Sequence, residues 1–183
     1  RRFQAVLPLK GKPLNTEKRR LKTILENDEI KSIVSALGVG VGEELTMESL
    51  KYDKVIILSD ADQDGAHIRS ILLTFSFRYM KELLLEGHVY IGMPPLYKVT
   101  KGSTVIYCYD DNELNNAMAQ AGRSGNLQRY KGLGEMNPSQ LWDTTLNPET
   151  RSLVRVTLED AAEADRLVTV LMGDSADARR DYI

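Results

Sequence analysis

Three carboxylates alternate along the segment Asp60-Ala61-Asp62-Gln63-Asp64-Gly65. Ionised side chains this close repel one another, and a divalent cation bound among them relieves the repulsion. Because the chain has a single cysteine, any metal must be bound through oxygen or histidine. Carboxylate oxygens favour Mg²⁺ or Mn²⁺, and Ca²⁺ can substitute. The pattern predicts a divalent-metal site at Asp60, Asp62 and Asp64, of the kind that assists phosphoryl transfer.

Two other interpretations of the aspartates explain less of the pattern. An EF-hand calcium loop begins in the same way, but its twelfth position, here Ile71, requires a bidentate glutamate. The preceding segment also has the pattern of a strand, where an EF-hand needs a helix. Simple helix capping explains one or two aspartates, but it does not explain three at the end of one strand.

The histidines and the cysteine add little further chemistry. His67 follows the aspartates and is a candidate catalytic residue, as a phosphate donor or as a general acid or base. Local hydrogen bonding at the start of a helix explains it equally well. His88, just before a predicted strand, is interpreted as structural. The lone Cys108 excludes an internal disulfide and a thiolate metal cluster.

The elements around the aspartates predict an α/β fold with a parallel sheet flanked by helices. Residues 54–58 form a short apolar run that is typical of a strand buried in a parallel sheet. Apolar side chains at helical spacing predict a helix over 66–84, and residues 89–91 predict a second strand. This is a βαβ unit, in which ligands bind at the carboxyl ends of the strands. The aspartates lie at such an end.

Further elements are predicted on both sides of the βαβ unit, and the second half of the chain mixes strands and helices. We predict one domain over residues 1–100 and a hairpin and helical tail region over 101–183. The other predicted elements are a strand over 3–9, helices within 17–37 interrupted near Asn27, a C-cap at Gly38, a turn at 39–42, a hairpin over 96–109, and helices over 111–121, from Pro138 to Trp142 and over 158–172.

Basic residues are concentrated near the start of the chain. The first 31 residues hold nine Lys and Arg against four Asp and Glu, whereas the net charge of the chain is −2. This basic segment is either a surface for a polyanion or the solvated face of an amphipathic helix. No apolar run is long enough to span a membrane. We predict a cytoplasmic protein with no membrane partner.

The segment from Ile57 to Arg69, which contains the alternating aspartates, resembles the Toprim domain of type IIA DNA topoisomerases. Other segments resemble the same family, and their order and spacing make the resemblance specific over nearly the whole chain. They are Pro8–Asn15, Gly87–Tyr90, Pro94–Lys98, Arg129–Met136 and Leu171–Asp174.

The resemblance implies a Toprim domain joined to the tail region of a gyrase B or topoisomerase IV B subunit. Asp60 and Asp62 would be catalytic metal ligands, and Asp64 a third carboxylate close to them. Bound Mg²⁺ would polarise a DNA phosphate and stabilise the leaving 3′ oxygen. The attacking tyrosine would belong to an A-type partner subunit, in an assembly of two A and two B subunits.

The resemblance also implies contacts with double-stranded DNA. Lys10, Lys12 and Asn15 would lie on a DNA-contacting loop, and Arg129 and Lys131 in a basic motif of the tail. Contacts of these side chains with phosphates would position DNA without reading its sequence.

The family's catalytic glutamate and its ATP-binding domain would both lie upstream of Phe3. We therefore expect neither DNA cleavage nor ATP hydrolysis by this chain alone. A Toprim primase or nuclease is one alternative, but it does not need the Arg129–Met136 segment. A non-catalytic, Mg²⁺-dependent DNA-binding module is another. The sequence does not distinguish gyrase from topoisomerase IV.

Overall fold

The structure is a computed structural model that describes residues 3–182, except for the side chain of Arg123. Arg1 and Arg2, which belong to the predicted basic segment, and Ile183 lie outside the described residues. The chain forms two compact units. Unit 1 comprises residues 1–55, 68–90 and 155–183, and unit 2 comprises residues 56–67 and 91–154.

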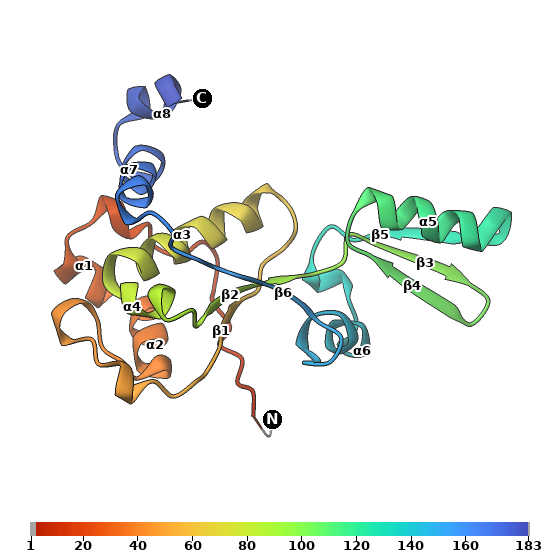
Figure 1. Cartoon of the computed structure of the whole chain (residues 1–183), viewed down its shortest axis with the longest axis horizontal. Helices are drawn as coiled ribbons and strands as arrows, with labels where there is room; N and C mark the ends of the chain where they lie inside the picture. The colour runs from red at the N-terminus through yellow and green to blue at the C-terminus, as the bar shows by residue number, and fades with distance from the viewer. Residues whose placement is uncertain (1–2, 183) are drawn as a thin grey trace. The chain divides into compact units, whose positions relative to one another are not determined.

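A three-stranded sheet has the strand order β1-β2-β6 (Figure 1). Its strands are β1 (Val55–Ile57), β2 (Val89–Met93) and β6 (Ser152–Arg155), of which β6 was not predicted. The helices α3 (Gln63–Tyr79) and α4 (Lys81–Leu85) connect β1 to β2. The fold is of the α/β class, with parallel strands in the sheet, which confirms the predicted class.

The helix predicted over 66–84 is two helices. Its apolar stripe is confirmed, because Ile71, Phe75 and Leu83 are all buried. The backbone leaves the helical conformation at Met80, which has φ −141° and ψ 43°. Met80 is itself buried, so the break lies inside the core of unit 1.

The N-terminal part of unit 1 is helical. Asn27 separates its two helices as predicted, and the side chain of Asn27 accepts a hydrogen bond from the Ile30 amide at 3.0 Å. Gly38 ends the second helix with φ 80°, which favours glycine. The elements are η1 (Thr16–Lys18), α1 (Leu21–Glu26), α2 (Asp28–Leu37), η2 (Gly42–Glu44) and η3 (Met47–Ser49).

The strand predicted over residues 3–9 is wrong for the described residues, which form no strand or helix before Thr16. Phe3 and Val6 are 68% and 73% exposed, so the alternating apolar side chains have no buried face on which to pack. A strand also needs a hydrogen-bonding neighbour, and neither described sheet includes this segment.

Unit 2 contains an antiparallel sheet packed against α5 (Asp111–Ala121), as Figure 1 shows. The predicted hairpin and helix are confirmed, with strands β3 (Tyr97–Lys101) and β4 (Thr104–Cys108). A further strand, β5 (Asn126–Arg129), pairs with β3 and was not predicted, because its polar sequence carries no apolar alternation. Val99, Cys108, Ala117 and Ala121 form the core between sheet and helix.

The rest of unit 2 is made of short helical segments. The predicted helix from Pro138 is confirmed, and Asn137 and Gln140 form a capping box at its start. It continues beyond α6 as a π-helical turn. The segments are η4 (Gly122–Ser124), η5 (Leu133–Glu135), α6 (Pro138–Leu141) and η6 (Trp142–Leu146).

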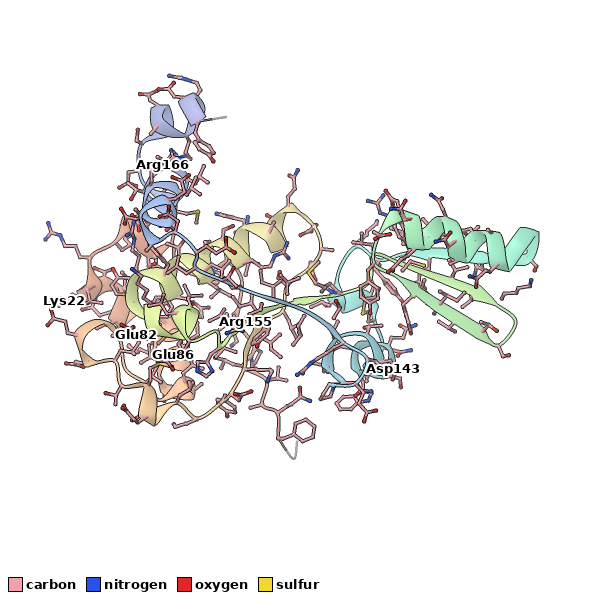
Figure 2. The ribbon with its side chains drawn as sticks, viewed as in Figure 1. Lys22, Glu82, Glu86, Asp143, Arg155 and Arg166 are labelled. Carbon is pink, nitrogen blue, oxygen red and sulfur yellow. The ribbon has the colours of Figure 1, made fainter. Side chains whose placement is uncertain are left out.

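The helices α7 (Ala161–Met172) and α8 (Ala176–Tyr182) return the chain to unit 1. The Asn15 side chain donates to the Met172 carbonyl at 2.9 Å. The Arg155 guanidinium lies 3.4 Å from the carbonyl oxygen of Glu86 at the end of α4, and Figure 2 labels both residues. These contacts join Arg155 and α7 to the rest of unit 1. The predicted division of the chain at residue 100 stays a prediction.

Candidate functional site

A tight turn after β1 holds the first two aspartates. The Asp62 carboxylate accepts a hydrogen bond from the Gly65 amide at 2.8 Å and so caps α3. The Ser59 hydroxyl donates to the Gly65 carbonyl at 3.1 Å. A Cβ atom on Gly65 would lie 1.9 Å from the backbone oxygen of Asp60. Because no side chain fits there, the turn requires glycine at this position.

Asp60 is bound by a distant part of unit 2, residues 130–136, which we call the 130–136 turn. The Leu133 amide donates to Asp60 Oδ1 at 2.8 Å. Gly132 passes so close that a Cβ atom there would lie 2.8 Å from Asp60 Oδ2. The sequence alone did not predict this pairing, although a glycine within the Arg129–Met136 segment can mark a place where another group approaches the backbone closely.

Asp62 and Asp64 are exposed, whereas Asp60 is half-buried. Asp64 lies in the first turn of α3, where its negative charge interacts favourably with the helix dipole. Within residues 3–182, no three His, Cys, Asp or Glu side chains form a group that could hold a metal ion, so the three aspartates are not gathered together. Asp60 and Asp62 nevertheless offer the hard oxygen atoms that Mg²⁺ prefers. A site with these two ligands fits that ion.

The two histidines have different surroundings. His67 is exposed on α3, and its predicted catalytic role stays a prediction. His88 Nδ1 lies 2.7 Å from the Asp53 carbonyl, and the His88 amide donates to the Leu83 carbonyl at 2.9 Å. These contacts support the structural interpretation of His88.

The predicted DNA-contacting loop belongs to unit 1. Lys10 and Lys12 are exposed. The Asn15 side chain is half-buried, accepts from the Glu17 amide at 3.1 Å and donates to Met172. Asn15 therefore has a capping role in the chain itself, and DNA contact through it stays a prediction.

The predicted basic motif of the tail belongs to unit 2. Arg129 ends β5 and Lys131 lies in the 130–136 turn, and both side chains are exposed. The Lys131 amide donates to the Glu135 carboxylate at 3.0 Å, which fixes the backbone at this position. Arg129 and Lys131 are therefore close in sequence to the Leu133 amide, which binds Asp60.

Tyr130 is buried without a hydrogen-bond partner for its hydroxyl among the described residues. It is 5% exposed, and burial is the main cause that raises its pKa to about 12. The unfolded chain therefore loses this proton first as the pH rises from the ordinary pKa of 10.0. Tyr130 accordingly lowers the free energy of unfolding over that alkaline range.

We expect Tyr130→Phe to leave stability at pH 7 unchanged or to raise it by about 1 kcal/mol, because it removes an unsatisfied buried hydroxyl. Urea unfolding at pH 7 measures this change in stability. The same measurement at pH 11 shows how much stability the ionisation of Tyr130 in the unfolded chain removes. The variant should lose less stability than the parent between these pH values. A variant that is destabilised at pH 7 would mean that the hydroxyl has a partner.

Known protein families match both parts of the chain. Residues 1–94 match the Toprim domain, and residues 122–183 match the carboxyl terminus of the DNA gyrase B subunit. The chain therefore belongs to the Toprim family. Together the two matches identify it as a portion of a type IIA DNA topoisomerase B subunit, of the gyrase or topoisomerase IV type.

Curated relatives of both types are equally similar. The chain is 54% identical to the DNA gyrase B subunit of Clostridium acetobutylicum over 186 residues, and 54% identical to that of Archaeoglobus fulgidus over 183 residues. It is also 54% identical to the B subunit of DNA topoisomerase 4 of Streptococcus pneumoniae over 187 residues. Each alignment covers the whole chain but 29% of the relative. No helix in the described residues has the length and apolar character to cross a membrane.

Proposed function

We propose that this chain provides the metal-binding part of the DNA cleavage and religation centre of a type IIA topoisomerase. The observation that carries the proposal is the placement of Asp60 and Asp62 after β1, where each carboxylate accepts a hydrogen bond from a backbone amide. Such bonds orient metal ligands before the ion binds. The similarity to gyrase and topoisomerase IV B subunits favours this reaction over that of a primase or nuclease.

In this proposal Asp60 and Asp62 hold Mg²⁺, and Asp64 adds negative charge close by. The ion, when bound, supplies a Lewis acid for a DNA phosphate. Lys10, Lys12 and Asn15 in unit 1, and Arg129 and Lys131 in unit 2, bind DNA phosphates and hold the duplex. His67, which is exposed on α3, donates to a phosphate in this proposal.

The attacking tyrosine belongs, in this proposal, to an A-type subunit in an A₂B₂ assembly in the cytoplasm. A chimaera tests this part directly. This chain would replace the matching 29% of the gyrase B subunit of C. acetobutylicum, and the chimaera would be combined with the corresponding A subunit. We expect Mg²⁺-dependent cleavage of plasmid DNA that is abolished by Asp60→Asn. Metal-dependent DNA binding with no cleavage would favour a non-catalytic DNA-binding module.

Asparagine variants separate the metal-binding role of the aspartates from their structural role. Asp60→Asn and Asp62→Asn keep an oxygen that can accept from Leu133 and Gly65, so stability should change by less than about 1 kcal/mol. Both remove the negative charge that binds a cation. Calorimetric titration with Mn²⁺, in the presence of a short DNA duplex, should show an affinity lower by about tenfold or more.

Asp28→Asn is the matched control, because Asp28 is an exposed carboxylate at the first position of α2. It should bind Mn²⁺ as the parent does. Unchanged binding in both Asp60→Asn and Asp62→Asn would place the metal elsewhere and contradict the proposal. Asp62→Ala should also lose about 1 kcal/mol of stability, since it removes the cap of α3.

A further inference from the structure

We propose that Gly132 and the Leu133 amide position the Asp60 carboxylate for metal binding, so that the 130–136 turn is a working part of the metal site. This inference rests on the proposed function. Asp60 and the turn lie in the same compact unit, although 73 residues of chain separate Asp60 from Leu133.

The close approach at Gly132 is the first step of the argument. A Cβ atom on Gly132 would lie 2.8 Å from Asp60 Cγ, 2.8 Å from Oδ2 and 2.9 Å from Oδ1. The backbone of Gly132 is extended, with φ −168° and ψ 171°, which any residue can adopt. Glycine is therefore needed here to leave room for the Asp60 carboxylate. The backbone angles themselves do not require glycine.

The hydrogen bond from Leu133 is the second step. The amide donates to Oδ1 at 2.8 Å, a length typical of a strong bond to a charged acceptor. The Gly132 backbone and the Leu133 amide both lie against the Asp60 carboxylate, and together they restrict its rotation. A ligand that is already oriented loses less conformational entropy when a cation binds.

The third step is the rigidity of the 130–136 turn. The Tyr130 amide donates to the Leu96 carbonyl at 2.9 Å, and the Glu135 amide donates to the Gly132 carbonyl at 3.2 Å. Met136, at the other end, is buried and accepts a contact from the Thr144 hydroxyl at 3.7 Å. Because both ends of the turn are fixed, Gly132 cannot move away from Asp60 without breaking these contacts.

The test compares two alanine variants in the same turn. Gly132→Ala places a methyl group against the Asp60 carboxylate. Gly134→Ala is the control, because a Cβ atom there meets nothing within 4 Å. We expect Gly132→Ala to weaken Mn²⁺ binding by about tenfold, and Gly134→Ala to bind as the parent does. Mn²⁺ affinity is measured by calorimetry, and thermal unfolding is measured in the presence of a chelator.

Leu133→Pro is a second variant. It removes the hydrogen bond, because proline has no amide hydrogen, and it places the ring Cδ atom where that hydrogen points at Asp60 Oδ1. Proline is tolerated at the first position of a helical turn, and the extended Gly132 is compatible with a following proline. It should also weaken Mn²⁺ binding about tenfold. This variant keeps the inference testable if Gly132→Ala does not fold.

Asp60→Asn distinguishes failure of this inference from failure of the proposed function. If Asp60→Asn abolishes Mn²⁺ binding while Gly132→Ala and Leu133→Pro bind as the parent does, the positioning role is wrong and the metal site stands. If Asp60→Asn binds Mn²⁺ normally, the metal site itself is wrong, and the inference is lost with it. Weaker binding in both turn variants, with metal-free unfolding temperatures close to that of Gly134→Ala, supports the positioning role.

Discussion

Gly65→Ala is expected to lower the free energy of unfolding by about 3 kcal/mol or more. The added methyl carbon would lie 1.9 Å from the Asp60 backbone oxygen and 2.7 Å from its carbonyl carbon. Backbone cannot move aside as a flexible side chain can. Relief of the clash requires the turn after β1 to open, which breaks the bonds of Gly65 with Ser59 and Asp62. Urea unfolding followed by circular dichroism measures the loss.

The same variant should lose Mn²⁺ binding, because opening the turn displaces both Asp60 and Asp62. Ala66→Gly is a useful companion, since it alters the next helix position without adding an atom and should cost about 1 kcal/mol. A Gly65→Ala protein with the stability of the parent would show that the turn has a different conformation from the one described.

Arg78→Ala is expected to lower the free energy of unfolding by about 3 kcal/mol, because it leaves a largely buried carboxylate without its partner. Arg78 Nε and Nη2 bind the two oxygens of Glu17 at 2.7 Å and 2.9 Å. The side chains of Arg78 and Glu17 are 23% and 15% exposed. Arg78 also binds Asp165 and, at 3.0 Å, the Thr169 hydroxyl, so one guanidinium joins α3, η1 and α7.

Arg78→Lys should recover part of the loss, because lysine keeps the charge but cannot bind both oxygens of Glu17 in this planar arrangement. The hydrogen bond to Glu17 is the main cause that raises the pKa of Arg78 above its usual value, so the guanidinium stays charged at any pH used for unfolding. Urea unfolding at pH 7, in low and in high salt, measures the free energy of unfolding of Arg78→Ala and of Arg78→Lys.

Arg166 provides the matched control on α7 (Figure 2). It also binds a carboxylate with two nitrogen atoms, at 2.8 Å and 2.6 Å from the oxygens of Glu163. The side chains of this pair are 52% and 48% exposed. Because solvent screens such a pair, Arg166→Ala should cost less than about 1 kcal/mol. Equal losses for the Arg78 and Arg166 variants would contradict the importance of burial at Arg78.

Local chemistry made much of the fold predictable. The hairpin from Tyr97 to Cys108 and the helix from Asp111 to Ala121 follow from apolar alternation, a glycine turn and an aspartate cap. The break at Asn27 follows from its preference for capping. The βαβ unit follows from an apolar strand and an amphipathic helix of sufficient length. These signals act over a few residues, so they can be read without the tertiary structure.

Pairings between distant segments could not be predicted in this way. The polar strand Asn126–Arg129 exists because β3 offers it an edge, and β6 exists because it pairs with β2. Residues 3–9 alternate as a strand does, but neither sheet among the described residues includes them. Strand formation depends on a neighbouring strand, and a single sequence does not show which segment that neighbour is.

The sequence by itself determined the residue types of the candidate site, because three alternating aspartates at a strand end predict a hard cation. Only the tertiary structure decided how these carboxylates are held apart and oriented. Asp62 caps its own helix, whereas Asp60 is bound by Leu133 and crowded by Gly132. Contacts across 73 residues depend on how the chain packs, and packing is a property of the whole unit rather than of any local pattern.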